Sequence, residues 1–267
     1  MKPEELRMLE QAQKNAAKIE RPPLPDEIDV NKLHAIGTYN PMRVVTPEMI
    51  KVAAAKRRAA TAKYRAEQKR RIIFDRLAML ARDCGPRLLD PETLKQSEYD
   101  VYDKAQSALL TEIDSYIAEI DQRVGRGDGI VLIGKPGTGK DHLCIRVARL
   151  AIIDADADVR WIDGKALYPL ALDAVRGGTD RMPQFIMPKI LILSDPVTPK
   201  ENLSPYQHDA LSRIINERWL HKRPTFVTSN CKTLEEMESL IDSRLMSRLK
   251  QGALIWKCTW PDYRERA

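Results

Sequence analysis

The chain has 267 residues, of which 43% are hydrophobic and 31% are charged, a balance typical of a folded globular protein. No apolar run approaches the roughly 20 residues that a membrane span requires, and no apolar signal core follows Met1, so we expect a cytoplasmic protein without membrane contact. The four cysteines lie far apart and form no CxxC pair, which argues against a zinc site or a disulfide framework.

Positive charge is concentrated in the N-terminal third of the chain. The net charge is +6, and residues 1–83 contain 18 Lys and Arg against 11 Asp and Glu, whereas the rest is close to neutral. This asymmetry indicates a region that meets an acidic partner, either nucleic acid or protein.

We expect residues 1–83 to form a helical N-terminal region. Residues 1–20 have apolar side chains at helical spacing, and a lone amphipathic helix of this kind suits a groove on a partner. Thr46 and Pro47 predict the start of a second helix that runs to about Asp83. Its many basic residues could contact DNA phosphates, or they could form a solvated charged face.

The remaining chain divides into a connecting part and a core. Residues 84–128 form a linker with an amphipathic helix near 101–124. From residue 129 to 267, short apolar runs alternate with helical stretches. The runs predict strands at residues 130–133, 159–162, 190–193 and 225–228. Alternation of this kind predicts an α/β fold with a parallel sheet covered by helices on both faces.

A glycine-rich segment follows the first of these strands and opens a helix. It fits the pattern GxxxxGK and consists of Gly134, Lys135, Pro136, Gly137, Thr138, Gly139 and Lys140. Backbone N–H groups in such a loop curl around phosphates, and the helix N-terminus adds partial positive charge. Lys140 would neutralise phosphate oxygens, so we predict an ATP or ADP site that extends to Asp141 and His142.

The residue after the loop lysine departs from the usual pattern. A Ser or Thr hydroxyl normally stands there as a ligand of Mg²⁺, whereas this chain has Asp141. A carboxylate is also a good Mg²⁺ ligand, although it adds negative charge beside the triphosphate. Alternatively, Asp141 only stabilises the first turn of the helix.

The strand at 190–193 ends where many nucleotide hydrolases carry two acidic residues. Here Ser194, Asp195 and Pro196 follow. In one register, Ser194 takes the Mg²⁺ position and Asp195 polarises the attacking water. If the register is shifted by one residue, Asp195 becomes the metal ligand and Pro196 takes the position of the catalytic base. In the first register, carboxylate and hydroxyl have exchanged places around one Mg²⁺. The alternative is a site that binds nucleotide but hydrolyses it slowly.

Three segments of the C-terminal half, read with these motifs, resemble the DnaC-type helicase loaders, which are AAA+ ATPases. The first is 222–230, in which the resemblance makes Asn230 the sensor that positions water near the γ-phosphate. The second is 242–249, which contains the candidate arginine fingers Arg248 and, as second choice, Arg244. The third is 260–264, which the resemblance identifies as the end of a loader with Arg264 as a second sensor.

This resemblance implies an ATP-dependent loader that places a hexameric replicative DNA helicase on single-stranded DNA. An arginine that acts on a neighbouring subunit implies a homo-oligomer, often an open ring or spiral. The N-terminal region would hold the helicase contact. A loader with these departures is of a kind that a phage or prophage could carry.

Three other functions compete with this interpretation. A transposition helper ATPase of the IstB-like kind shares the core and a helical N-terminus. A nucleotide-locked adaptor without turnover is compatible with Asp141 and Pro196. An origin-binding initiator would need a further helical DNA-reading domain after the ATPase, whereas this chain stops at Ala267, which disfavours it.

Overall fold

The computed structural model describes residues 46–85, 104–199 and 201–263. The chain divides into two compact units, Met1–Ala60 and Thr61–Ala267. The helix predicted for residues 1–20 and the candidate sensor Arg264 lie outside the described residues. The division into regions at residues 83 and 128 stays a prediction.

The long basic helix predicted from Thr46 is confirmed as α3 (Pro47–Cys84). The Met49 N–H donates to the Thr46 hydroxyl at 3.3 Å, as expected for a capping residue. In the first unit, the described side chains are exposed except for the half-buried Ala54. In the second unit, the last turns pack on the core through fully buried Leu80.

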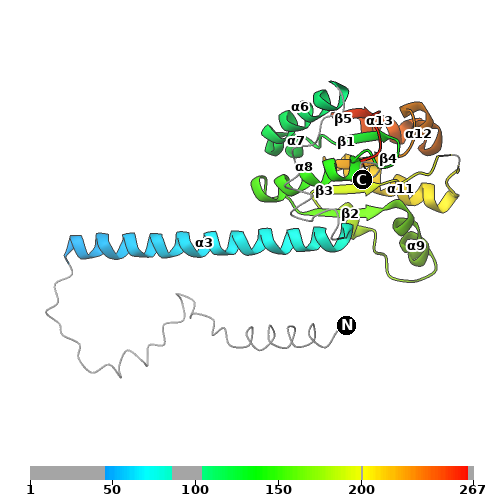
Figure 1. Ribbon diagram of the computed structural model, residues 1–267. Coiled ribbons are helices and arrows are strands. Elements are labelled where there is room, and N and C mark those ends of the chain that lie inside the picture. Colours follow the sequence, from blue (N-terminus) through cyan, green and yellow to red (C-terminus); the bar gives the residue numbers. More distant parts are fainter. Residues whose placement is uncertain (1–45, 86–103, 200, 264–267) are drawn as a thin grey trace, which may run out of the picture. The chain divides into compact units, whose positions relative to one another are not determined.

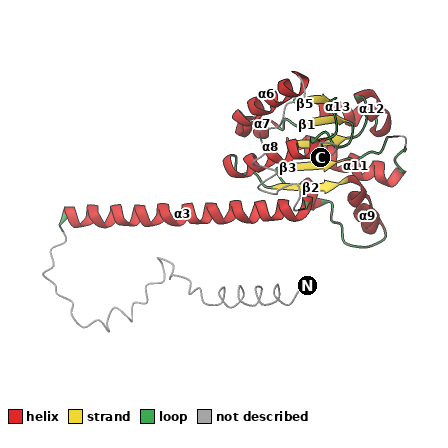
Figure 2. Ribbon diagram, in the orientation of Figure 1, coloured by secondary structure: helices red, strands yellow, loops and turns green. Residues whose placement is uncertain are grey.

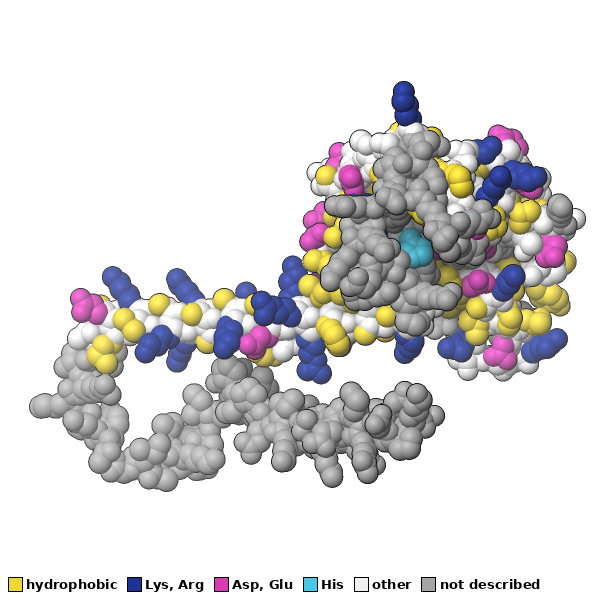
Figure 3. Space-filling view, viewed as in Figure 1, with side chains coloured by type: hydrophobic (Ala, Val, Ile, Leu, Met, Phe, Trp, Pro, Cys, Tyr) yellow, Lys and Arg dark blue, Asp and Glu magenta, His cyan; other side chains and the backbone are white. Residues whose placement is uncertain are grey.

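Most basic side chains of α3 are exposed to solvent (Figure 3). They include Lys51, Lys56, Arg57, Arg58, Lys63, Arg65, Lys69, Arg70 and Arg71. Closer to the core, two arginine–aspartate pairs involve this helix, Arg76 with Asp156 and Arg160 with Asp83. The helix is therefore anchored at its C-terminal end.

Among the described helices, none is both long and apolar enough to cross a membrane.

A five-stranded parallel sheet forms the centre of the second unit (Figure 1). Its order is β2-β3-β4-β1-β5. The strands are β1 (Ile130–Gly134), β2 (Val159–Asp163), β3 (Ile190–Ser194), β4 (Thr225–Ser229) and β5 (Leu254–Cys258). The four strands predicted from apolar runs are all present, and the predicted parallel α/β class is confirmed.

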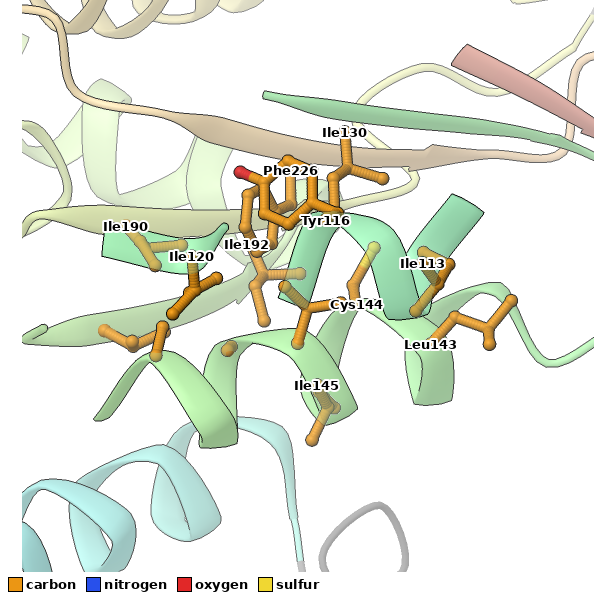
Figure 4. Packing of buried hydrophobic residues seen from close by; sticks show 14 of the residues in the cluster. Ile113, Tyr116, Ile120, Ile130, Leu143, Cys144, Ile145, Ile190, Ile192 and Phe226 are labelled. Atoms are coloured by element: carbon orange, nitrogen blue, oxygen red, sulfur yellow. The ribbon is translucent and has the colours of Figure 1, made fainter. Parts of the chain in front are cut away.

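Side chains that alternate along the strands build two separate cores. Ile130 and Leu132 of β1 face one cluster, whereas Val131 and Ile133 face the other. Figure 4 shows part of the first cluster, in which Tyr116 meets Phe226 edge to face at 6.0 Å between ring centroids. Each face of the sheet is therefore sealed by helices, as parallel sheets require.

Helices cover both faces of the sheet (Figure 2). The first face carries α6 (Lys104–Ala118), α7 (Ile120–Arg126) and α8 (Lys140–Asp154). The second carries α9 (Gly164–Val175), α10 (Pro183–Ile186), α11 (Pro205–Leu220), α12 (Leu234–Ile241) and α13 (Ser243–Lys250).

Two details differ from the sequence prediction. The helix expected over 101–124 is interrupted at Glu119 and becomes α6 and α7, the second of which ends at the left-handed Gly127. Strand β5 was not predicted. Among the described strands it pairs only with β1, and as an edge strand it stays partly exposed, so the polar Lys257 can interrupt its apolar pattern.

Candidate nucleotide-binding site

The glycine-rich loop connects β1 to α8 at the carboxyl edge of the sheet. Gly134, Gly137 and Gly139 all have positive φ, and Gly139 is the residue from which α8 begins. A side chain at position 134 would also collide with the Cys258 carbonyl of β5. The predicted strand–loop–helix context is therefore present, and its glycines are needed for the backbone path.

Lys140 is turned back into its own loop. Its Nζ donates to the carbonyl oxygens of Gly134 at 2.9 Å and Lys135 at 2.8 Å, and to Oδ1 of Asn230 at 3.1 Å. Burial lowers the pKa of Lys140, because the charged form loses water contacts. Phosphate oxygens could replace these neutral acceptors with charged ones, which a lysine ammonium prefers.

Asn230 and Asp195 extend this chain of hydrogen bonds. The Nδ2 of Asn230 donates to Oδ2 of Asp195 at 2.7 Å. The other carboxylate oxygen of Asp195 is buried without a hydrogen-bond partner, and its backbone is left-handed with φ of 44°. Burial, with Asp141 nearby, raises the pKa of Asp195 to about 6. An unsatisfied buried carboxylate oxygen here fits a site that receives water or a cation.

Asp141 lies against two hydroxyl groups rather than pointing to solvent. Its Oδ1 accepts from Ser194 at 3.0 Å and from Thr228 at 2.7 Å. These three residues come from α8, β3 and β4, and Ser194 and Thr228 are almost fully buried. No group of three or more His, Cys, Asp or Glu that could hold a metal occurs in the described part of the chain.

Most of the predicted site residues lie together. The loop, Lys140, Asp141, Ser194, Asp195 and Asn230 meet at one edge of the sheet. His142 follows them in the first turn of α8, where burial lowers its pKa. The sequence analysis missed Thr228. Part of the signal was available, because Thr228 ends the strand predicted at residues 225–228, but only the structure shows that this strand lies beside β3.

The C-terminal segment lies on the phosphate loop. The indole N–H of buried Trp260 donates to the Thr138 carbonyl at 2.9 Å, and the Tyr263 N–H donates to the Gly137 carbonyl at 3.0 Å. The Asp262 carboxyl group fills the space that a side chain at position 137 would need. Nothing in the sequence predicted this acidic neighbour of the loop.

Both candidate finger arginines lie on α13, and Arg248 is not near the loop. Arg244 is exposed at the start of the helix. Arg248 lines a cleft with Gly129 and Thr225, where β1 and β4 begin, so it lies towards the amino edge of the sheet. The carboxyl edge of the same sheet carries Lys140, so Arg248 belongs to a different part of the surface.

Comparison with known proteins identifies relatives. No family model matches the chain. The replicative helicase loader DnaC of Escherichia coli strain K12 is 26% identical over 171 residues, which are 63% of this chain and 68% of the relative.

Solved structures agree with that sequence match. A crystal structure of the DnaC helicase loader aligns with a TM-score of 0.54 at 20% identity, over 61% of this chain and 94% of that one. A crystal structure of DnaI aligns with a TM-score of 0.53 at 20% identity, over 67% and 93%. The chain has an AAA+ fold, and in sequence it resembles the DnaC-type replicative helicase loaders.

Proposed function

We propose that this protein is an ATP-dependent helicase loader, which binds a hexameric replicative DNA helicase and helps to place it on single-stranded DNA. The observation that carries the proposal is the 26% identity to DnaC over 171 residues. The glycine-rich loop, Lys140 and Asn230 meet at one edge of the sheet, as a nucleotide-dependent loader would need.

The nucleotide would sit on the loop between β1 and α8. Backbone N–H groups at the start of α8 favour anionic phosphates, and Lys140 supplies the cation. Binding would draw the Lys140 ammonium away from Asn230, to which it now donates. The nucleotide state is thereby coupled to Asn230 and, through it, to Asp195.

Mg²⁺ would be held next to Asp141, with Ser194 and Thr228 as neighbouring oxygen donors. Oxygen ligands suit this hard cation, and substrate phosphates usually complete its shell. The hydroxyl-to-carboxylate contacts of 3.0 and 2.7 Å support the idea that carboxylate and hydroxyl have exchanged positions between loop and strand. The metal, when bound, supplies charge neutralisation for the phosphates.

Hydrolysis would depend on Asp195. Because burial raises its pKa to about 6, the Asp195 carboxylate is a stronger base than an ordinary aspartate and is still mostly ionised near neutral pH. The following residue, Pro196, departs from the acidic pair of efficient hydrolases. The proline in place of a second acidic residue favours slow turnover, or a second candidate function: an adaptor that switches by binding nucleotide with little hydrolysis.

Arg248 would act on the nucleotide of a second copy. It lies towards the amino edge of the sheet, whereas the loop lies at the carboxyl edge, so it suits a neighbour's phosphates better than its own. Arg244, at the other end of α13, is the alternative. Assembly of several copies around shared nucleotides is part of the proposal.

The N-terminal region would provide the helicase contact. The exposed basic side chains of α3 are also available for single-stranded DNA, which would bind them with strong salt dependence.

Co-elution tests the proposal: the full chain is mixed with the replicative helicase of its host, with ATP or ADP, and the mass of the complex is measured by light scattering. A defined complex is expected, and separate elution in both nucleotide states would refute it.

A further inference from the structure

A cleft of about 520 Å³ lies towards the amino edge of the sheet, away from the phosphate loop. The ends of α7 and α11, the C-terminal half of α13 and the starts of β1 and β4 surround it. Its cationic and aromatic lining consists of Arg126, Trp219, Lys222, Arg223 and Arg248. Asp128, the acidic residue of the lining, already pairs with Arg126 at 2.8 Å.

Within this cleft, Trp219 holds the Arg248 side chain. The guanidinium carbon of Arg248 lies 4.9 Å from the centroid of the indole ring. The ring itself is fixed, because its Nε1–H donates to Oε1 of Gln251 at 2.6 Å. A free arginine side chain has many rotamers, so a stacking surface that selects one orientation reduces the entropy lost in later contacts.

One donor of Arg248 has been left without an acceptor. Its Nη1 is buried and makes no hydrogen bond. A buried donor without a partner is destabilising, and in native structures such groups are rare enough that each calls for an explanation. The guanidinium is therefore oriented, and because Arg248 as a whole is only partly buried, its more exposed donors can meet an anionic acceptor that arrives from outside the subunit.

We infer that Trp219, fixed by Gln251, is the positioning residue of Arg248, and that it presents the guanidinium to the phosphates bound by a second copy of this chain. The inference rests on the proposed action of Arg248 in trans. Trp219 itself does not touch the nucleotide. It acts only on the copy that donates the arginine, and this directionality separates a positioning role from a general structural one.

The test mixes two complementary variants of the full chain. A Lys140→Ala copy cannot hold the phosphates but still presents Arg248, so it is the donor. An Arg248→Ala copy keeps the loop, so it is the acceptor. With a non-hydrolysable ATP analogue, association of the labelled acceptor with the donor is followed by sedimentation, so the readout does not require turnover.

Trp219→Leu is then introduced into one copy at a time. In the donor, we expect association to weaken about five-fold, the equivalent of about 1 kcal/mol for a lost cation–π contact. In the acceptor, the same change should leave association unaltered. Trp219→Phe in the donor keeps a ring for stacking but loses the hydrogen bond to Gln251, so it should restore only part of the association. The side chain is 42% exposed, so both variants are expected to fold.

Two different failures are distinguishable. If donor and acceptor do not associate even with wild-type Trp219, the in-trans action of Arg248 is wrong, and the inference falls with it. If they associate but Trp219→Leu has no effect in the donor, or an equal effect in either copy, the positioning role alone is overturned.

Discussion

The hydroxyl of Ser194 lies 3.0 Å from the carboxylate of Asp141, although the two residues are 53 positions apart. One ends a strand and the other opens a helix, so the contact depends on the parallel topology. If it marks the exchanged Mg²⁺ ligands, Asp141→Thr and Ser194→Asp should each weaken Mg²⁺-dependent binding of a fluorescent ATP analogue about ten-fold. The double variant should recover most of this loss. Independent effects of the two changes would show that the residues do not share one ion.

Thr228 should contribute to the same site. Thr228→Val removes the hydroxyl that donates to Asp141 at 2.7 Å but keeps the buried shape. Because an acceptor then loses its partner, we expect Mg²⁺-dependent nucleotide binding to weaken by about 1–2 kcal/mol. Thr228→Ser, which keeps the hydroxyl, is the matched control. Equal affinities for the valine and serine variants would remove Thr228 from the site.

The raised pKa of Asp195 predicts how stability depends on pH. The pKa is about 6 in the folded protein and 3.8 in the reference state, so between these values the folded chain binds more protons than the unfolded chain. Stability therefore falls as the pH rises from about 4 to 6. Asp195→Asn removes this part of the dependence and still accepts from Asn230. Urea unfolding should show that the stability of the variant relative to wild type increases from pH 4 to pH 6. A stability difference that stays constant over this interval would contradict the assignment.

The Asp262 carboxyl group should oppose nucleotide binding, because it lies against Gly137 in the phosphate loop. Its negative charge would repel phosphates a few ångströms away. We expect Asp262→Asn to tighten ADP binding about five-fold in titration calorimetry, an effect that weakens in high salt. Asp121→Asn, an exposed neutralisation on α7, is the control and should change nothing. Unchanged or weaker binding by the Asp262 variant would show that the carboxylate is harmless or helpful.

Arg218 should be essential for stability rather than for nucleotide binding. It is fully buried and donates to the Thr225 hydroxyl and to five backbone carbonyls, which join α11 to the segment before β3 and to the start of β4. Arg218→Met removes all of these hydrogen bonds. The Ile186 and Pro224 carbonyls keep another donor, but the loss of the remaining bonds should still lower the free energy of unfolding by about 3 kcal/mol or more. Arg213→Met on the same helix breaks only an exposed pair with Asp180 and should cost less than about 1 kcal/mol.

Four of the five strands and the glycine-rich loop could be predicted from local patterns in the sequence. Four strands are runs of apolar residues, and the loop's glycines all lie within residues 134–139, so neither needs long-range information. Strand β5 escaped notice because an edge strand is only partly buried. Asp262 and Trp219 escaped because their partners, Gly137 and Arg248, are distant in sequence, and only the folded chain brings them together.

The central claim is tested most directly by helicase loading on closed circular single-stranded DNA. The full chain, the hexameric helicase and ATP are combined, and DNA-bound helicase is counted after removal of free protein. We expect wild type to increase loading several-fold and Lys140→Ala to lose this gain, while Asp121→Asn keeps it. Loading that is the same with wild type, with Lys140→Ala and without the protein would contradict the account.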